Sequence, residues 1–156
     1  MFVTAFQIDN PGVTHRLDKV LSAATDTPLG RVRMVTTEDL ERSSGRWFAE
    51  DVDLGIQITR YRGDFPAEIE VFSRAEYDQR EVLERVAREL EVTILTDQLD
   101  VNPLSDIEWL MISPDGSSSV VYIDDEEFGA DDPAIILVPD SRAVYESKRI
   151  GSPSSV

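Results

Sequence analysis

The stretch from Leu54 to Glu91 decides the fold because the spacing of its apolar residues changes once along its length. Its sequence is LGIQITRYRGDFPAEIEVFSRAEYDQREVLERVARELE. Apolar and polar residues alternate over 54–59 and again over 68–71, which predicts two half-buried strands. The Arg-Gly-Asp sequence at 62–64 is typical of a turn, so we expect these strands to pair antiparallel. Toward the end of the stretch the apolar spacing becomes i, i+3, i+4, i+7, which predicts an amphipathic helix.

This helix, predicted over 74–91, is the best-specified element of the chain. Ser73 and Glu76 have the spacing of a capping box, so we expect the helix to begin directly after Ser73. The apolar stripe that should pack on the sheet consists of Leu83, Val86, Ala87 and Leu90. The i, i+4 ion pairs expected on its solvent-exposed face are Glu81–Arg85 and Glu84–Arg88.

Similar patterns extend to both sides of this stretch. Residues 2–8 alternate and predict a strand, and residues 11–24 have helical spacing behind an Asn-Pro start. A proline and a glycine within 113–116 favour a turn between two further strands. The strands expected in this second half cover 107–112, 119–123 and 134–138.

The order of elements predicts a single α+β domain over residues 1–150. We expect a mixed, mostly antiparallel sheet of about six to seven strands, with two main helices packed on one face. The Ser/Pro-rich residues 151–156 predict a flexible tail.

Charge is the strongest functional feature of the sequence. The formal net charge is −16, from 31 Asp and Glu against 15 Lys and Arg. Residues 89–141 contain 14 of the acidic side chains and no Lys or Arg, whereas residues 1–88 are nearly balanced. Phosphate contacts need basic side chains, so we expect no nucleic-acid partner and no anionic membrane.

The sequence has no pattern typical of catalysis. It has no cysteine, which excludes disulfides and thiolate sites and fits a reducing compartment. The first residues do not resemble a secretory signal, so we expect a cytoplasmic protein. His15, the only histidine, lies off the apolar stripe of its helix and is expected on the surface. No Gly-x-Ser-x-Gly and no glycine-rich phosphate loop occurs, so we predict neither enzyme activity nor a cofactor.

An acidic loop is the candidate binding region. Its carboxylates are Asp124, Asp125, Glu126, Glu127, Asp131 and Asp132. They do not have the spacing of a calcium-binding loop, in which a glycine follows the third acidic position, so we predict no metal site there. Trp109 joins the candidate partner-binding residues because tryptophan is enriched at interfaces. Core packing is the default expectation for Trp109, and an anchoring role requires that it face outward.

In composition the chain resembles small, acidic, cysteine-free bacterial proteins that inhibit basic toxins stoichiometrically. This resemblance implies an immunity-protein or antitoxin-like function against a basic effector, for example a nuclease. One alternative is a structural or regulatory domain whose acidity serves solubility or a salty cytoplasm. Another is a small enzyme that uses carboxylates and a divalent metal ion.

Overall fold

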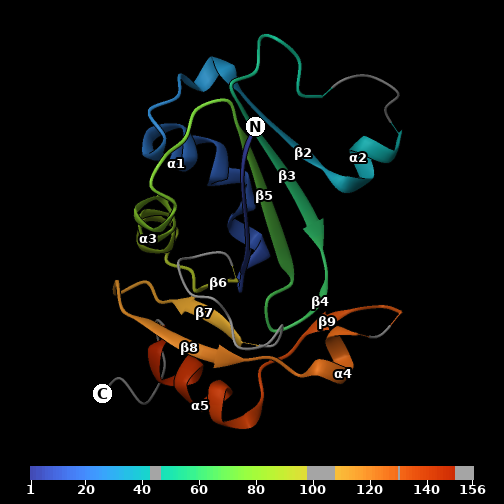
Figure 1. The fold of residues 1–156 in the computed structure, drawn as a ribbon, viewed down its shortest axis with the longest axis vertical. Coiled ribbons are helices and arrows are strands. Elements are labelled where there is room, and N and C mark those ends of the chain that lie inside the picture. Colours follow the sequence, from blue (N-terminus) through green and yellow to red (C-terminus); the bar gives the residue numbers. More distant parts are fainter. Residues whose placement is uncertain (43–46, 98–107, 130, 150–156) are drawn as a thin grey trace.

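A seven-stranded mixed sheet forms the centre of the protein, in the order β2-β3-β5-β1-β6-β7-β8 (Figure 1). The computed structural model describes residues 1–42, 47–97, 108–129 and 131–149. The strands of this sheet are β1 (Phe2–Ile8), β2 (Val32–Thr36), β3 (Leu54–Arg60), β5 (Ala67–Ser73), β6 (Ile94–Thr96), β7 (Glu108–Ile112) and β8 (Ser118–Tyr122). Within the described part of this sheet only the β2–β3 pair is parallel, which confirms the predicted α+β class and mostly antiparallel sheet. The predicted tail at 151–156 lies outside the described residues.

The hairpin predicted within the opening stretch is present as β3 and β5. Their register places Ile58 opposite Ile69, so the apolar residues of both strands share one face. The turn contains a short strand, β4 (Arg62–Gly63), which leaves the main sheet and pairs with β9 (Ala134–Ile135). Gly63 has φ +104°, and a Cβ there would lie 2.3 Å from the carbonyl oxygen of Ile135. Only glycine allows this close approach of two backbones.

Two helices, α1 (Leu17–Ala24) and α3 (Gln79–Leu90), pack side by side on one face of the sheet, as predicted (Figure 1). All four residues of the predicted α3 stripe are buried. The segment before α1, predicted as helix from residue 11, is a 3₁₀ helix over Pro11–Arg16. No helix in the described part of the chain combines the length and apolar character needed to cross a membrane.

The predicted start of α3 at Ser73 is wrong. Asp78 is the N-cap residue, and its Oδ1 accepts a hydrogen bond from the Glu81 N–H at 3.1 Å. Ser73 instead ends β5, where it pairs with Phe2 of β1. Ladder pairing with β1 therefore outweighs the local capping pattern at Ser73.

The predicted ion pairs on α3 are also replaced by others. Arg80 pairs with Glu84 at 3.1 Å, and Arg85 pairs with Glu89 at 3.0 Å. The guanidinium of Arg85 also donates to the Ala23 carbonyl of α1 at 3.3 Å. Contacts outside the helix thus influence which acidic neighbour each arginine reaches.

A second layer covers the opposite face at the other end of the sheet. It consists of α4 (Asp125–Phe128), β9 and α5 (Pro139–Lys148), which lies below β8 in Figure 1. The sequence pattern did not predict α5. The last predicted strand, 134–138, forms only β9 and an isolated bridge between Ile123 and Leu137. The remaining helices are η2 (Leu29–Arg31) and α2 (Thr37–Arg42).

The protein therefore has two hydrophobic cores on opposite faces of one sheet. Neighbouring residues of a strand point to opposite faces, so Ile94 lies in the first core and Leu95 in the second. Ile112 and Met111 divide in the same way on β7. The second core consists of Phe65, Leu95, Trp109, Met111, Val121, Ile123, Ile135, Leu137 and Tyr145.

Candidate functional site

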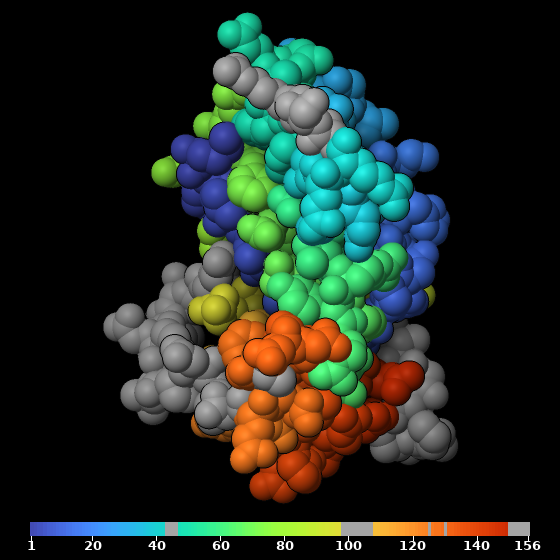
Figure 2. Space-filling model, turned by 90° about the vertical axis from the view of Figure 1, so that its right-hand side faces the viewer, coloured from blue at the N-terminus to red at the C-terminus, as the bar shows by residue number. Residues whose placement is uncertain are grey.

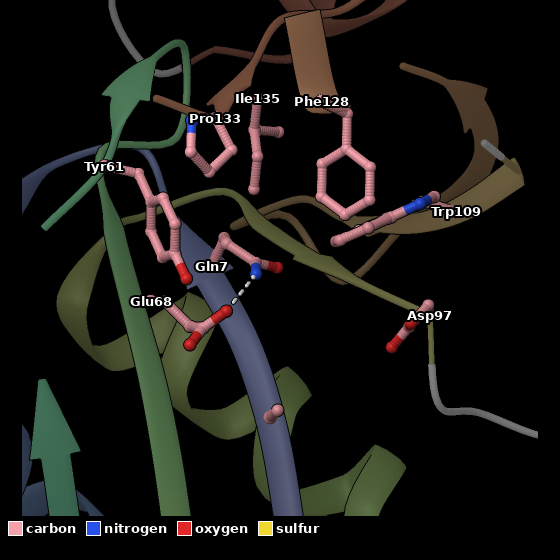
Figure 3. Close-up of a pocket in the computed structure, with 9 residues that line it drawn as sticks. Gln7, Tyr61, Glu68, Asp97, Trp109, Phe128, Pro133 and Ile135 are labelled. Carbon is pink, nitrogen blue, oxygen red and sulfur yellow. Dashed lines mark hydrogen bonds between the residues drawn. The ribbon is translucent and has the colours of Figure 1, made fainter. Parts of the chain in front are cut away.

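A pocket of about 310 Å³ lies beside the second core, on the sheet face that α1 and α3 leave uncovered. The described residues that line it are Ala5, Gln7, Tyr61, Glu68, Asp97, Trp109, Phe128, Pro133 and Ile135 (Figure 3). They come from β1, β5, β7, α4 and β9 and from residues that border β3 and β6. In Figure 2 the segment around α4 and β9 (orange) lies against the end of the β3–β5 hairpin (green).

Strand register brings the polar floor of the pocket together. Gln7 of β1 lies directly opposite Glu68 of β5 in the antiparallel ladder. The Gln7 Nε2 donates a hydrogen bond to Glu68 Oε2 at 3.1 Å, and Gln7 is only 4% exposed. This bond orients the half-buried Glu68 carboxylate within the pocket (Figure 3).

Three aromatic rings form the walls. Trp109 meets Phe128 edge to face, with ring centroids 5.8 Å apart and planes at 80°. Tyr61 stands on the opposite side, near Glu68 (Figure 3). Trp109 is 6% exposed and belongs to the second core. It therefore has the core-packing role that was the default expectation from the sequence, and it also lines the pocket.

The charged side chains among the described lining residues of the pocket are all acidic. Burial raises the pKa of Glu68 above its usual value, and the nearby carboxylates of Glu70 and Asp97 raise it further. Burial and the same two glutamates, Glu68 and Glu70, also raise the pKa of Tyr61. No Lys, Arg or His occurs among the described lining residues. Negative charge therefore accumulates in a partly apolar site, where it is costly without a cation.

The acidic loop borders this pocket through α4, and its first carboxylate has a structural role. Asp124 Oδ1 accepts hydrogen bonds from the backbone N–H groups of Glu126 (3.0 Å) and Glu127 (3.2 Å). Asp125 is the first residue of α4. Asp124 thus holds the short helix that presents Phe128 to the pocket.

Two further carboxylates of the loop contact a cation from the other half of the chain. The Arg62 side chain on β4 lies between Asp132, at 2.7 Å, and Glu127, at 3.9 Å. Arg62 Nη2 also donates to the Asp132 carbonyl at 2.7 Å. Glu126 and Asp131 are exposed, and neither has an ion pair with another residue in the described part of the chain. The predicted loop residues whose side chains the structure describes therefore differ in role.

Other candidate chemistry from the sequence is not assembled into a site. His15 is exposed, and its Nδ1 lies 3.1 Å from the Gly12 carbonyl oxygen. Within the described ranges, no three His, Asp or Glu side chains are grouped so that they could hold a metal ion.

Sequence reasoning missed Gln7, Tyr61 and Glu68 as site residues. Each sits in a strand or turn pattern that ordinary amphipathic packing explains. The available signal was Gln7, which with Thr4 is one of two polar residues in the otherwise apolar β1. Its partner Glu68 is 61 positions away, and only the β1–β5 register reveals it.

The fold and the site define an α+β protein with an acidic pocket walled by aromatic rings. No protein-family model, curated protein or solved structure matches this chain. The geometry and charge of the site are therefore the evidence for its function.

Proposed function

We propose that the protein is a non-enzymatic acidic binding protein, of the immunity or antitoxin-like class, whose partner is a basic effector such as a nuclease. One observation carries the proposal: the segment 89–141 has 14 acids and no Lys or Arg, and its described strands and helices from residue 108 on build the end of the molecule that borders the pocket. Like charges gathered on one surface repel each other and reduce stability, so a complementary partner is the simplest compensation.

Binding begins with long-range attraction. A net charge of −16 draws a basic protein toward the acidic end and speeds productive encounters, an effect that salt screens. Within the acidic loop, Glu126 and Asp131 are the side chains most available for this role, because both are exposed and α4 does not need either as its cap. Asp124 is a poor test residue because replacing it removes the hydrogen bonds that hold α4.

The experiment compares association rates with the basic product of a neighbouring gene across a salt series. The variant Glu126→Lys/Asp131→Lys reverses two exposed charges of the loop. The control Glu38→Lys/Glu41→Lys changes the net charge equally but lies on α2, outside the acidic segment. We expect the loop variant to associate about tenfold more slowly at low salt, and the difference to vanish near 1 M, where the Debye length is about 3 Å.

Equal slowing by both variants would indicate that only total charge matters, as in a domain whose acidity serves solubility. Association of the loop variant at the wild-type rate would reject the acidic end as the binding face.

A further inference from the structure

The chemistry of the pocket selects an organic cation as its occupant. The faces of Trp109, Phe128 and Tyr61 attract positive charge through their ring quadrupoles. An anion would be repelled by Glu68 and Asp97, and a neutral apolar group would desolvate these carboxylates without compensation. Rings and carboxylates in one cavity therefore favour the same ligand class.

Glu68 is arranged to accept such a ligand. Its Oε2 is held by Gln7, whereas its Oε1 accepts no hydrogen bond from the described residues. Asp97, close enough to raise the pKa of Glu68, lines the pocket on the same side as Trp109 in Figure 3. A cation between these groups would form charge-assisted hydrogen bonds and relieve the repulsion among the carboxylates.

Size and shape favour a guanidinium over a hydrated ammonium or a metal ion. A volume of about 310 Å³ is at the small end of ligand pockets, near the scale of one long side chain. A guanidinium is planar, weakly hydrated and able to stack on a ring while its N–H fork faces a carboxylate. Calcium takes six to eight oxygen ligands, whereas the described lining contains two carboxylates and one amide.

The pocket also lies where the proposed partner would arrive. Phe128, which forms one wall, belongs to α4 in the acidic loop. The loop residues Glu126 and Asp131 are exposed on either side of it in the sequence. A basic surface attracted to the loop is therefore brought next to the cavity.

From these observations we propose that the pocket receives an arginine side chain of the basic protein partner, with its guanidinium against Glu68 and between the aromatic walls. This inference rests on the proposed function and names the contact that anchors the partner. Aromatic-lined, desolvated pockets that take one arginine are typical of binding hot spots.

The test is an NMR titration of the ¹⁵N-labelled protein with N-acetyl-arginine amide. The corresponding citrulline compound is the neutral isostere, and α-N-acetyl-lysine amide is the ammonium control. We expect saturable shifts at the Gln7 side-chain amide and the Trp109 indole N–H with the arginine compound, weaker shifts with lysine and none with citrulline. Binding of citrulline as tight as that of arginine would overturn the proposal.

Three variants locate the contact, two of them in the pocket and one a control outside it. Glu68→Gln keeps the shape and the acceptor for Gln7 but removes the charge, so affinity should fall about tenfold. Glu76→Gln, beyond the opposite end of β5, removes the same charge outside the pocket and should bind as wild type does. Phe128→Leu removes a partly exposed ring and should weaken binding several-fold, which keeps the test decisive if Glu68→Gln does not fold.

Dependence on pH adds a readout. Because the pKa of Glu68 is raised in the free protein, protonation competes with the guanidinium at acidic pH. Affinity should therefore increase as pH rises through that pKa, and Glu68→Gln should lose most of this dependence.

The outcomes separate this inference from the proposed function. If Glu68→Gln and Glu76→Gln bind the arginine compound equally, the pocket does not receive the arginine side chain. The proposed function is then still tested independently by the salt series with the loop variants. If free arginine binds more tightly than the blocked compound, the cavity is a small-molecule site and the partner assignment is wrong.

Discussion

The two cores of this protein share one sheet but differ in how their surroundings are charged. The first core lies under α1 and α3, where acids and bases alternate and pair within α3 itself. The second core lies under α4, β9 and α5, and most of its residues come from the segment 89–141, which has no basic residue. The first basic residues after this segment, Arg142 and Lys148, lie on α5. The acids of the segment obtain cations from outside it, as when Arg62 of β4 reaches Asp132.

This difference indicates that the two regions have different roles within one fold. A locally balanced surface contributes little long-range field, so the first region serves mainly to bury apolar area and hold the sheet. The second region concentrates charge around a pocket, at a cost to its own stability. Shared strands β6 and β7 connect the two, because each supplies alternate residues to both cores.

The largest expected effect comes from the first core. Leu83 of α3 is fully buried, and Leu83→Ala should lower the free energy of unfolding by about 2–5 kcal/mol. Urea melts followed by circular dichroism give this value. Val120→Ala on the exposed face of β8 is the control and should change stability by less than about 0.5 kcal/mol. A loss below half a kcal/mol for Leu83→Ala would mean that α3 does not stabilise the sheet.

A smaller effect is expected where the second region is fastened to the first. The Tyr145 hydroxyl of α5 donates to Asp9 Oδ2 at 2.8 Å, directly after β1. Tyr145→Phe leaves this partly buried carboxylate with one donor fewer and should cost about 1–3 kcal/mol. Tyr122→Phe, at an exposed tyrosine of β8, is the matched control and should be near neutral. Equal stability of the two variants in urea melts would show that this link is unimportant.

The smallest effect concerns pH at the same junction. Burial raises the pKa of Asp9, although hydrogen bonds from Tyr145 and the Thr93 N–H oppose this. The folded state then holds the proton more tightly than the unfolded state, so Asp9 contributes a loss of stability as pH rises between the two pKa values. Asp9→Asn should remove this contribution and flatten the profile from about pH 4 upward.

Urea midpoints measured across pH for wild type and Asp9→Asn test this expectation. Asp26→Asn, at an exposed position, is the control and should keep the wild-type slope. If Asp9→Asn also kept that slope, burial of Asp9 would not influence stability, and the junction would contribute only its hydrogen bonds.

Local patterns in the sequence were sufficient for elements whose side chains repeat regularly. The alternation around Ile56 and Ile69 predicted the β3–β5 hairpin, and the stripe ending at Leu90 predicted α3. These predictions succeeded because an amphipathic strand or helix of ordinary length must bury its apolar side, whatever covers it. The acidity of residues 89–141 is likewise a property of the sequence alone.

Tertiary structure decided the features that depend on distant partners. Among the residues of α5, only Ser141 and Tyr145 are buried, so its local pattern is weak and packing on the second core defines it. Ser73 had a good local capping pattern but completed a strand because β1 offered ladder pairing. Likewise, the meeting of Gln7 with Glu68 follows from β1–β5 register, a choice made between strands rather than within either one. Sequence thus determined the charge of residues 89–141, and the fold alone determined that Asp97 of this segment and Glu68 of β5 line one pocket.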